Sequence, residues 1–218
     1  MTQPTLEITI DDIKYGSSKT ILKSINLTID SVGLYGVFGR NGQGKSTFLK
    51  TLCGLKSYKG SIHFNNQILQ PSDVAFLATE PMIYEYLTAK EFYKFYQKVS
   101  GRKHSNSTRI FDIDERVLLK TMSTGTLKKA YINTILQFDD YRIYIFDEPF
   151  NGLDIESNYV LLQKIRALAK ENIVFVSSHI IEIVSPYLTK TFYVNEQKIT
   201  QVENENIMNM FMQSIDHG

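Results

Sequence analysis

One segment constrains this chain more than any other: a glycine-rich stretch that directly follows a short apolar run. Residues 34–38 form the run, which suits a buried strand, and residues 39–46 fit the pattern G-x-x-x-x-G-K-[ST]. Glycines let successive backbone N–H groups turn toward phosphate oxygens without a Cβ in the way. Lys45 would place a cation on those phosphates, and the Ser46 hydroxyl is a hard oxygen ligand suited to Mg²⁺. The pattern therefore predicts a strand, a phosphate-binding loop and a helix, in that order.

The whole loop is expected to contact a bound nucleotide. The helix that begins at its end points the positive end of its dipole at the same phosphates. The candidate binding residues are Gly39, Arg40, Asn41, Gly42, Gln43, Gly44, Lys45, Ser46 and Thr47.

Two later apolar runs end in polar side chains that suit catalysis. The run 143–146 is followed by Asp147 and Glu148, and the run 173–176 is followed, after two serines, by His179. Asp147 can hold Mg²⁺ through its water shell, as in other P-loop enzymes. Glu148 can orient or deprotonate an attacking water. Ligands of open parallel sheets bind at the carboxyl ends of the strands, so His179 is expected at the same site.

The order of the patterns predicts an α/β fold. Residues 6–10 and 25–29 alternate apolar and polar side chains, as half-exposed antiparallel strands do, and residues 60–69 suit a hairpin. Buried-type strands that alternate with helices, one of them around residues 157–170, indicate a parallel sheet covered on both faces. We expect a P-loop NTPase core with a parallel sheet and an N-terminal antiparallel β subdomain.

The middle of the chain reads as an inserted helical subdomain. Residues 88–137 show a helical pattern with a polar break at 100–108. We therefore expect one domain, with residues 1–80 and 138–218 in the core and residues 81–137 in the helical subdomain. The tail, residues 191–218, suggests two short strands and an amphipathic helix.

Composition excludes several classes of protein. The net charge of +1 argues against nucleic acid as the main partner, because proteins that neutralise many phosphates are basic. Cys53 is the single cysteine, so no internal disulfide can form; a reducing compartment and a buried structural thiol are expected. No stretch approaches the roughly 20 apolar residues that span a bilayer, and the start lacks a signal-peptide pattern. A cytoplasmic protein is expected.

A third motif discriminates among P-loop proteins. Met122-Ser123-Thr124-Gly125-Thr126 is similar to L-S-G-G-Q at the start of a helix, with Ser123 and Gly125 matching and two threonines departing. With the loop, the paired acids and His179 in order, the chain resembles the ATPase subunits of ATP-binding cassette (ABC) transporters over nearly its whole length. This resemblance implies ATP and Mg²⁺ as cofactors and ATP hydrolysis as the activity.

The resemblance also implies further site residues. Ser123 and Gly125 would reach the γ-phosphate of ATP held by a second subunit, and His179 would hydrogen-bond that phosphate in its own subunit. Residues 151–154 resemble the family's D-loop, which implies that Asp154 lies along the dimer interface. Tyr15 resembles the aromatic residue that stacks on adenine.

One position departs from the family pattern. Where members read Y-L-P-Q-E-P, this chain has Phe76-Leu77-Ala78-Thr79-Glu80-Pro81. Thr79 stands in place of a glutamine that touches Mg²⁺ and the attacking water, and a threonine is too short to span the same distance. Either Glu80 takes the place of that glutamine, or a water molecule bridges the remaining distance, or the coupling between the partner protein and the nucleotide is looser than in other members.

The resemblance implies a membrane role through partners. A head-to-tail dimer, expected to be a homodimer, would work with an integral membrane permease at the inner face of the membrane, most similar to small bacterial exporters. Most of the helical face formed by Phe92, Phe95, Tyr96 and Val99 is expected to be core, while some of these aromatics with Tyr84 and Tyr86 would receive the permease. The alternatives are a non-transport cassette acting on ribosomes or DNA, another P-loop class, and a hydrolysis-poor cassette.

Overall fold

The computed structural model describes residues 3–16, 19–80, 82–102 and 109–207. Its first sheet is antiparallel, with the strand order β2-β1-β4-β5. These strands are β1 (Leu6–Tyr15), β2 (Lys19–Ile29), β4 (Lys59–Phe64) and β5 (Gln67–Ile68). Alternate residues at the start of β1 are buried, as the period-2 pattern predicted.

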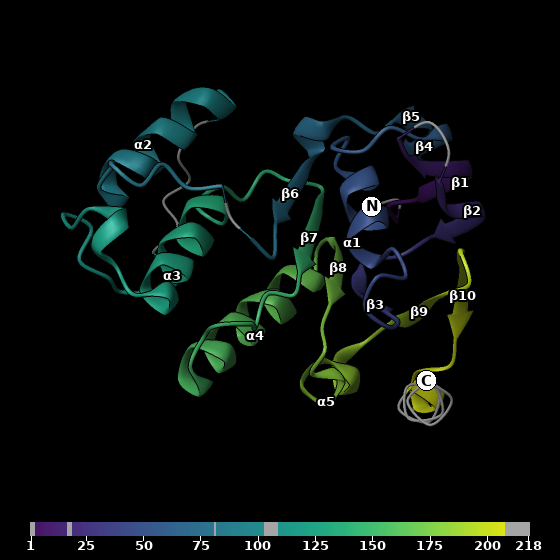
Figure 1. Cartoon of the computed structure of the whole chain (residues 1–218). Coiled ribbons are helices and arrows are strands. Elements are labelled where there is room, and N and C mark those ends of the chain that lie inside the picture. The colour runs from purple at the N-terminus through teal and green to yellow at the C-terminus, as the bar shows by residue number, and fades with distance from the viewer. Residues whose placement is uncertain (1–2, 17–18, 81, 103–108, 208–218) are drawn as a thin grey trace.

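The second sheet is mostly parallel and lies beside the first (Figure 1). Its order is β10-β9-β3-β8-β7-β6, in which only the pairing of β10 with β9 is antiparallel. The strands are β3 (Gly33–Phe38), β6 (Val74–Leu77), β7 (Ile143–Asp147), β8 (Ile173–Ser177), β9 (Lys190–Asn195) and β10 (Lys198–Val202). Every residue of β3, β7 and β8 is buried, because both faces of this sheet are covered.

Two hydrophobic cores form on the two faces of the parallel sheet. Helix α1 (Lys45–Leu52) and the antiparallel sheet cover one face, which receives Ile143 and Ile145 of β7. Helices α4 (Ile155–Ala169) and α5 (Ile181–Val184) contribute to the other face, which receives Tyr144 and Phe146. The predicted α/β class, with its antiparallel N-terminal sheet, is confirmed.

Cys53 follows α1 directly and is buried in the first of these cores. Its Sγ donates to the carbonyl of Leu49 at 3.1 Å, and burial raises the pKa of the thiol. The prediction of a small buried residue is confirmed.

Between β6 and β7 the chain forms α2 (Ala89–Ser100) and α3 (Thr124–Ile135), which lie beyond the β6 edge of the sheet (Figure 1). Short 3-10 turns are η1 (Pro71–Asp73), η2 (Leu119–Thr121), η3 (Ser185–Tyr187) and η4 (Asn204–Asn206). The expected subdomain boundaries near residues 81 and 137 stay a prediction. No described helix combines the length and the apolar character that crossing a membrane requires.

Residues 109–118 were expected to be helical, and this was wrong: the structure shows no helix there. The reason is a side chain that takes over the backbone bonds. Asn133 of α3 accepts hydrogen bonds from the N–H groups of Ile110 and Phe111, each at 3.0 Å, and so ties the start of this segment to α3.

The expected apolar face of α2 is core only in part. Phe92 is buried and Tyr96 packs against the core, whereas Phe95 and Val99 are exposed. The buried face is rotated toward Tyr93, which the pattern did not include. In the tail, β9 and β10 match the two expected strands, and the expected amphipathic helix falls on residues 208–218, outside the described part of the chain.

Candidate functional site

The glycine loop between β3 and α1 is shaped by steric constraints on its backbone. Gly39 has φ 146°, and a Cβ there would lie 2.3 Å from the carbonyl oxygen of Val194, so only glycine fits. Gly44 has φ 108° and directly precedes α1. The Lys45 ammonium closes the loop by donating to the carbonyls of Gly39 at 2.8 Å and Arg40 at 3.3 Å. The loop therefore presents backbone N–H groups and one cation at a helix N-terminus.

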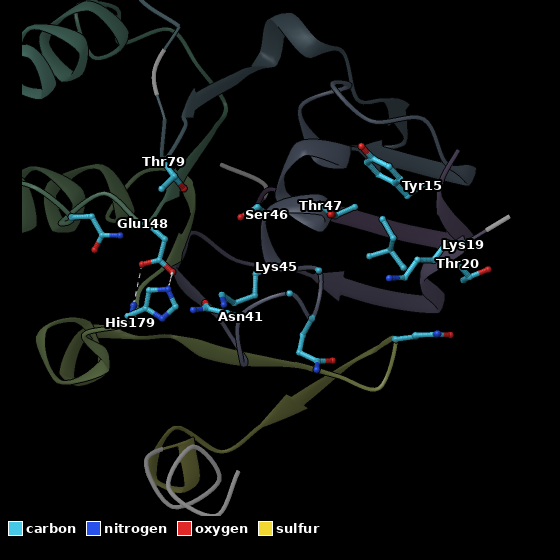
Figure 2. A pocket seen from close by; sticks show the side chains of 16 residues that line it. Tyr15, Lys19, Thr20, Asn41, Lys45, Ser46, Thr47, Thr79, Glu148 and His179 are labelled. Atoms are coloured by element: carbon cyan, nitrogen blue, oxygen red, sulfur yellow. Dashed lines mark hydrogen bonds and ion pairs between the residues drawn. The ribbon is translucent and has the colours of Figure 1, made fainter. Parts of the chain in front are cut away.

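A pocket of about 600 Å³ opens over this loop (Figure 2). In this view Glu148, His179 and Thr79 stand at one end and Tyr15 at the other, with the loop between them. Eleven predicted residues line it: Tyr15, Asn41, Gly42, Gln43, Gly44, Lys45, Ser46, Thr47, Thr79, Glu148 and His179. Segments that are far apart in the sequence thus converge on one elongated cavity.

Asp147, at the carboxyl end of β7, is 1% exposed and does not itself line the pocket. Its Oδ1 accepts hydrogen bonds from the hydroxyls of Ser46 at 3.1 Å and Ser177 at 2.8 Å. Two hard oxygen donors therefore meet beside the phosphate loop. Among the described residues no cluster of three acidic, histidine or cysteine side chains could hold a metal alone. This donor set suits Mg²⁺, which keeps waters and phosphate oxygens as its other ligands.

Glu148 follows β7 in a strained conformation, with φ 50°. The backbone N–H of His179 donates to its Oε2 at 3.0 Å, and His179 Nε2 lies 3.1 Å from its Oε1. The N–H of Glu148 itself donates to Ser177 Oγ at 3.0 Å. The carboxylate is therefore held against the pocket by a residue of the neighbouring strand's loop.

Burial and neighbouring charges shift the pKa values of the ionisable groups in the pocket. Burial raises the pKa of Glu148, against the lowering effects of His179 and Lys45. Burial lowers the pKa of Lys45, while Glu148 and Asp147 oppose that change. A carboxylate with a raised pKa is a stronger base than an ordinary one, so the geometry and the electrostatics both suit proton transfer from a bound water.

Thr79 and Tyr15 lie in the pocket with different surroundings. Thr79 Oγ1 donates to the backbone carbonyl of Asp147 at 3.1 Å, so its hydroxyl is engaged with the end of β7. Tyr15 is 71% exposed, and its ring has the Lys56 ammonium 5.0 Å from its centroid. An exposed ring at the pocket's outer end is available for stacking.

Ser123, Gly125 and Asp154 do not line the pocket of their own chain. Ser123 caps α3 by accepting from the N–H of Thr126 at 3.2 Å. Asp154 caps α4 by accepting from the N–H of Ser157 at 2.8 Å, and its Oδ2 lies 3.0 Å from Lys129 Nζ. The bonds with Ser157 and then Lys129 lower the pKa of Asp154.

Several residues at the site were not singled out from the sequence. Lys19, Thr20, Ile21, Asn151 and Gln197 also line the pocket. Ser177 is fully buried between Asp147 and Glu148, and its only signal was its place before His179 at a strand end. Lys128 and Lys129 match basic positions that often follow the signature-like motif, but the contact of Lys128 with the carbonyl of Glu148 was not predicted.

Comparisons with known proteins agree on one family. Residues 22–151 match the model described as ABC transporter. The lantibiotic transport ATP-binding protein SrtF of Streptococcus pyogenes is 30% identical, with 92% of this chain and 93% of SrtF covered. The hemin import ATP-binding protein HmuV of Idiomarina loihiensis is 25% identical, with 91% of this chain and 85% of HmuV covered.

The fold agrees as well. A solved ATP-binding subunit of an ABC transporter superposes with a TM-score of 0.79 at 23% identity, covering 95% of this chain and 93% of its own length. The chain therefore belongs to the ABC transporter family as an ATP-binding subunit, an ATPase whose activity is coupled to transport.

Proposed function

We propose that two copies of this chain close head to tail around two molecules of Mg²⁺-bound ATP, and that hydrolysis drives export through a separate membrane permease. The observation that carries this proposal is the shared pocket. It holds the glycine loop with Lys45 on one side and the buried Glu148, held by His179, on the other. These are the two parts that phosphoryl transfer to water needs: a phosphate cradle and a base.

The pocket's length suggests how ATP lies in it. Tyr15 at the outer end would stack on the adenine, and the glycine loop, of which residues 41–47 line the pocket, would hold the phosphates. Ser46 and Asp147 would hold Mg²⁺, which supplies charge stabilisation at the phosphate oxygens when bound. Thr79 would stand beside them through its bond to the Asp147 carbonyl.

Glu148 and His179 would then act on the attacking water. The raised pKa of Glu148 lets its carboxylate take a proton from a water placed in line with the terminal phosphate. His179, whose side chain is 40% exposed and lines the pocket, would donate to that phosphate while its backbone N–H holds the base. Closure of the site excludes other water and strengthens these interactions.

We propose a second copy because some of the predicted site residues lie outside the pocket of their own chain. Ser123 and Gly125 lie at the N-terminus of α3, outside the pocket of their own chain. A hydroxyl and a helix N-terminus suit an anion, which the partner's terminal phosphate would supply. Asp154, exposed at the start of α4, would run along the same interface.

We propose that the permease binds the surface of the helical segment between β6 and β7. Tyr84 and Tyr86 are 55% and 77% exposed, and Phe95 packs edge-on against Tyr84 with centroids 4.8 Å apart. Exposed aromatics of this kind suit a protein partner rather than solvent. The chain would thus sit in the cytoplasm at the inner face of the membrane.

The direction of transport that we propose is export. SrtF is named for lantibiotic transport, while HmuV is named for hemin import. The export proposal follows the resemblance to small exporter ATPases. Transport into inside-out vesicles made with the chain and its permease measures the direction directly.

The first experiment follows ATP hydrolysis against protein concentration for wild type and Glu148→Gln. Head-to-tail closure predicts that wild-type specific activity rises with concentration. Glu148→Gln is expected to bind ATP, lose hydrolysis about a hundredfold or more, and dimerise in ATP. A Glu148→Gln protein with near-wild-type turnover would contradict the base. A wild type that binds ATP and is silent at every concentration would favour a hydrolysis-poor cassette.

A further inference from the structure

The turn after β7 is held at both backbone groups of Glu148. Its φ of 50° is unusual for a residue with a Cβ. Its N–H donates to Ser177 Oγ at 3.0 Å, and its carbonyl accepts from Lys128 Nζ at 3.2 Å. A strained conformation of this kind persists only where the surroundings hold it. Side chains from β8 and α3 supply that hold here.

Lys128 is itself an unusual residue for this place. Its side chain is buried, with a relative exposure of 7%, although lysine is almost never fully buried without partners. Besides Glu148, it donates to the carbonyl of Asn151 at 2.6 Å. One ammonium thus bridges two carbonyls of the turn that follows the catalytic strand. These charge-assisted bonds compensate its desolvation.

The neighbouring contacts place α3 firmly against the same turn. A Cβ added to Gly125 would lie 3.3 Å from the carbonyl of Gly152, so α3 approaches the turn closely at its first residues. Lys129 forms an ion pair with Asp154 at 3.0 Å on the exposed side. The buried side chain of Lys128, by contrast, reaches the carbonyl of Glu148 from α3.

We propose that Lys128 is a positioning residue for ATP hydrolysis: it holds the backbone of Glu148 so that the carboxylate faces the attacking water. This inference rests on the proposed function, in which Glu148 is the base. Lys128 does not line the pocket of its own chain, and its ammonium is engaged with the carbonyls of Glu148 and Asn151. Its loss should therefore affect the chemical step and leave ATP binding in place.

The test compares Lys128→Met with wild type and with Lys50→Met, an exposed lysine of α1. Methionine keeps the length of the chain and removes the donors. Lys128→Met is expected to lower kcat about tenfold or more while the KM for ATP changes less than about threefold. Lys50→Met is expected to match wild type. A wild-type kcat for a folded Lys128→Met protein would overturn the proposal.

A double-mutant cycle separates positioning from a general structural role. In the Glu148→Gln background there is no base left to orient, so adding Lys128→Met is expected to leave the residual rate unchanged. The affinity for trinitrophenyl-ATP, measured by fluorescence, is expected to stay unchanged in both backgrounds. Equal losses of rate in the two backgrounds would show that Lys128 does not act through Glu148, and would overturn the proposal.

Two further measurements keep the outcomes distinct. If Lys128→Met does not fold by circular dichroism, Lys128→Gln replaces it; one amide donor is retained, and a kcat between those of wild type and Glu148→Gln is expected. A wild-type kcat for Lys128→Gln would overturn the proposal. Retained hydrolysis by Glu148→Gln alone would instead refute the proposed base, because that variant leaves Lys128 untouched.

Discussion

His179 contacts both carboxylate oxygens of Glu148, one through its backbone and one through its ring. The backbone N–H donates to Oε2 at 3.0 Å, and Nε2 lies 3.1 Å from Oε1. The two residues follow adjacent parallel strands, β7 and β8, whose ends meet at the same edge of the sheet. A substitution of the ring therefore removes one contact and leaves the other.

His179→Ala is expected to lower kcat by about ten- to a hundredfold, because the ring nitrogen no longer lies beside Oε1 and no longer faces the phosphate. The loss should be smaller than that of Glu148→Gln, since the backbone contact to Oε2 remains. Steady-state ATP hydrolysis with both variants measures the difference. A His179→Ala enzyme with wild-type kcat would remove His179 from the reaction.

Lys45→Ala should lose most nucleotide binding. The ammonium lies in the pocket beside the loop carbonyls that it bridges, and a charge-assisted contact to phosphate is worth about 1.5–3 kcal/mol. The affinity for ATP is therefore expected to fall about ten- to a hundredfold. Isothermal titration with Lys50→Ala as the control checks this. Equal affinity for both variants would place the phosphates elsewhere.

Tyr15→Ala should weaken ATP binding, and Tyr15→Phe should restore it, because stacking needs the ring and not the hydroxyl. The expected loss is about 1–2 kcal/mol, or five- to thirtyfold in Kd. Fluorescence titration with ATP gives both values. If Tyr15→Ala binds ATP as wild type does, adenine does not stack on this ring.

Gly39→Ala is expected to destabilise the protein more than Gly42→Ala. Both residues have positive φ, but a Cβ at Gly39 would lie 2.3 Å from Val194 O, whereas one at Gly42 meets nothing within 4 Å. Gly42→Ala should cost about 1 kcal/mol from φ alone, and Gly39→Ala clearly more. Thermal unfolding without nucleotide measures both. Equal Tm values would mean that the loop relaxes away from β9.

The lowered pKa of Lys128 predicts that the free energy of unfolding depends on pH. Burial lowers its pKa to about 8, against the raising effect of Glu148, while the unfolded value is near 10.4. Between these values the unfolded chain binds more protons, so the free energy of unfolding of wild type should rise with pH relative to Lys128→Met, by up to about 3 kcal/mol. Urea unfolding of both proteins from pH 7.5 to 10 tests this. Parallel curves would contradict the lowered pKa.

Local patterns in the sequence predicted most of the fold. The alternation of residues 6–10, the buried runs that became β3, β7 and β8, and the helix around residues 157–170 all appear in the structure. These predictions worked because apolar periodicity depends on neighbouring residues only. Residues 109–118 were missed because Asn133, more than twenty positions away, supplies the hydrogen bonds of Ile110 and Phe111.

The candidate site likewise has a part that the sequence predicted and a part that only the tertiary structure decided. The chain's own order of motifs determined that Lys45, Ser46, Asp147, Glu148 and His179 belong together, since strand ends of one parallel sheet share an edge. Only the tertiary structure decided how Glu148 is held. Glu148 has a positive φ. Its backbone contacts with Ser177 and Lys128 span 29 and 20 positions of sequence, and no local pattern encodes a hydrogen bond between distant elements.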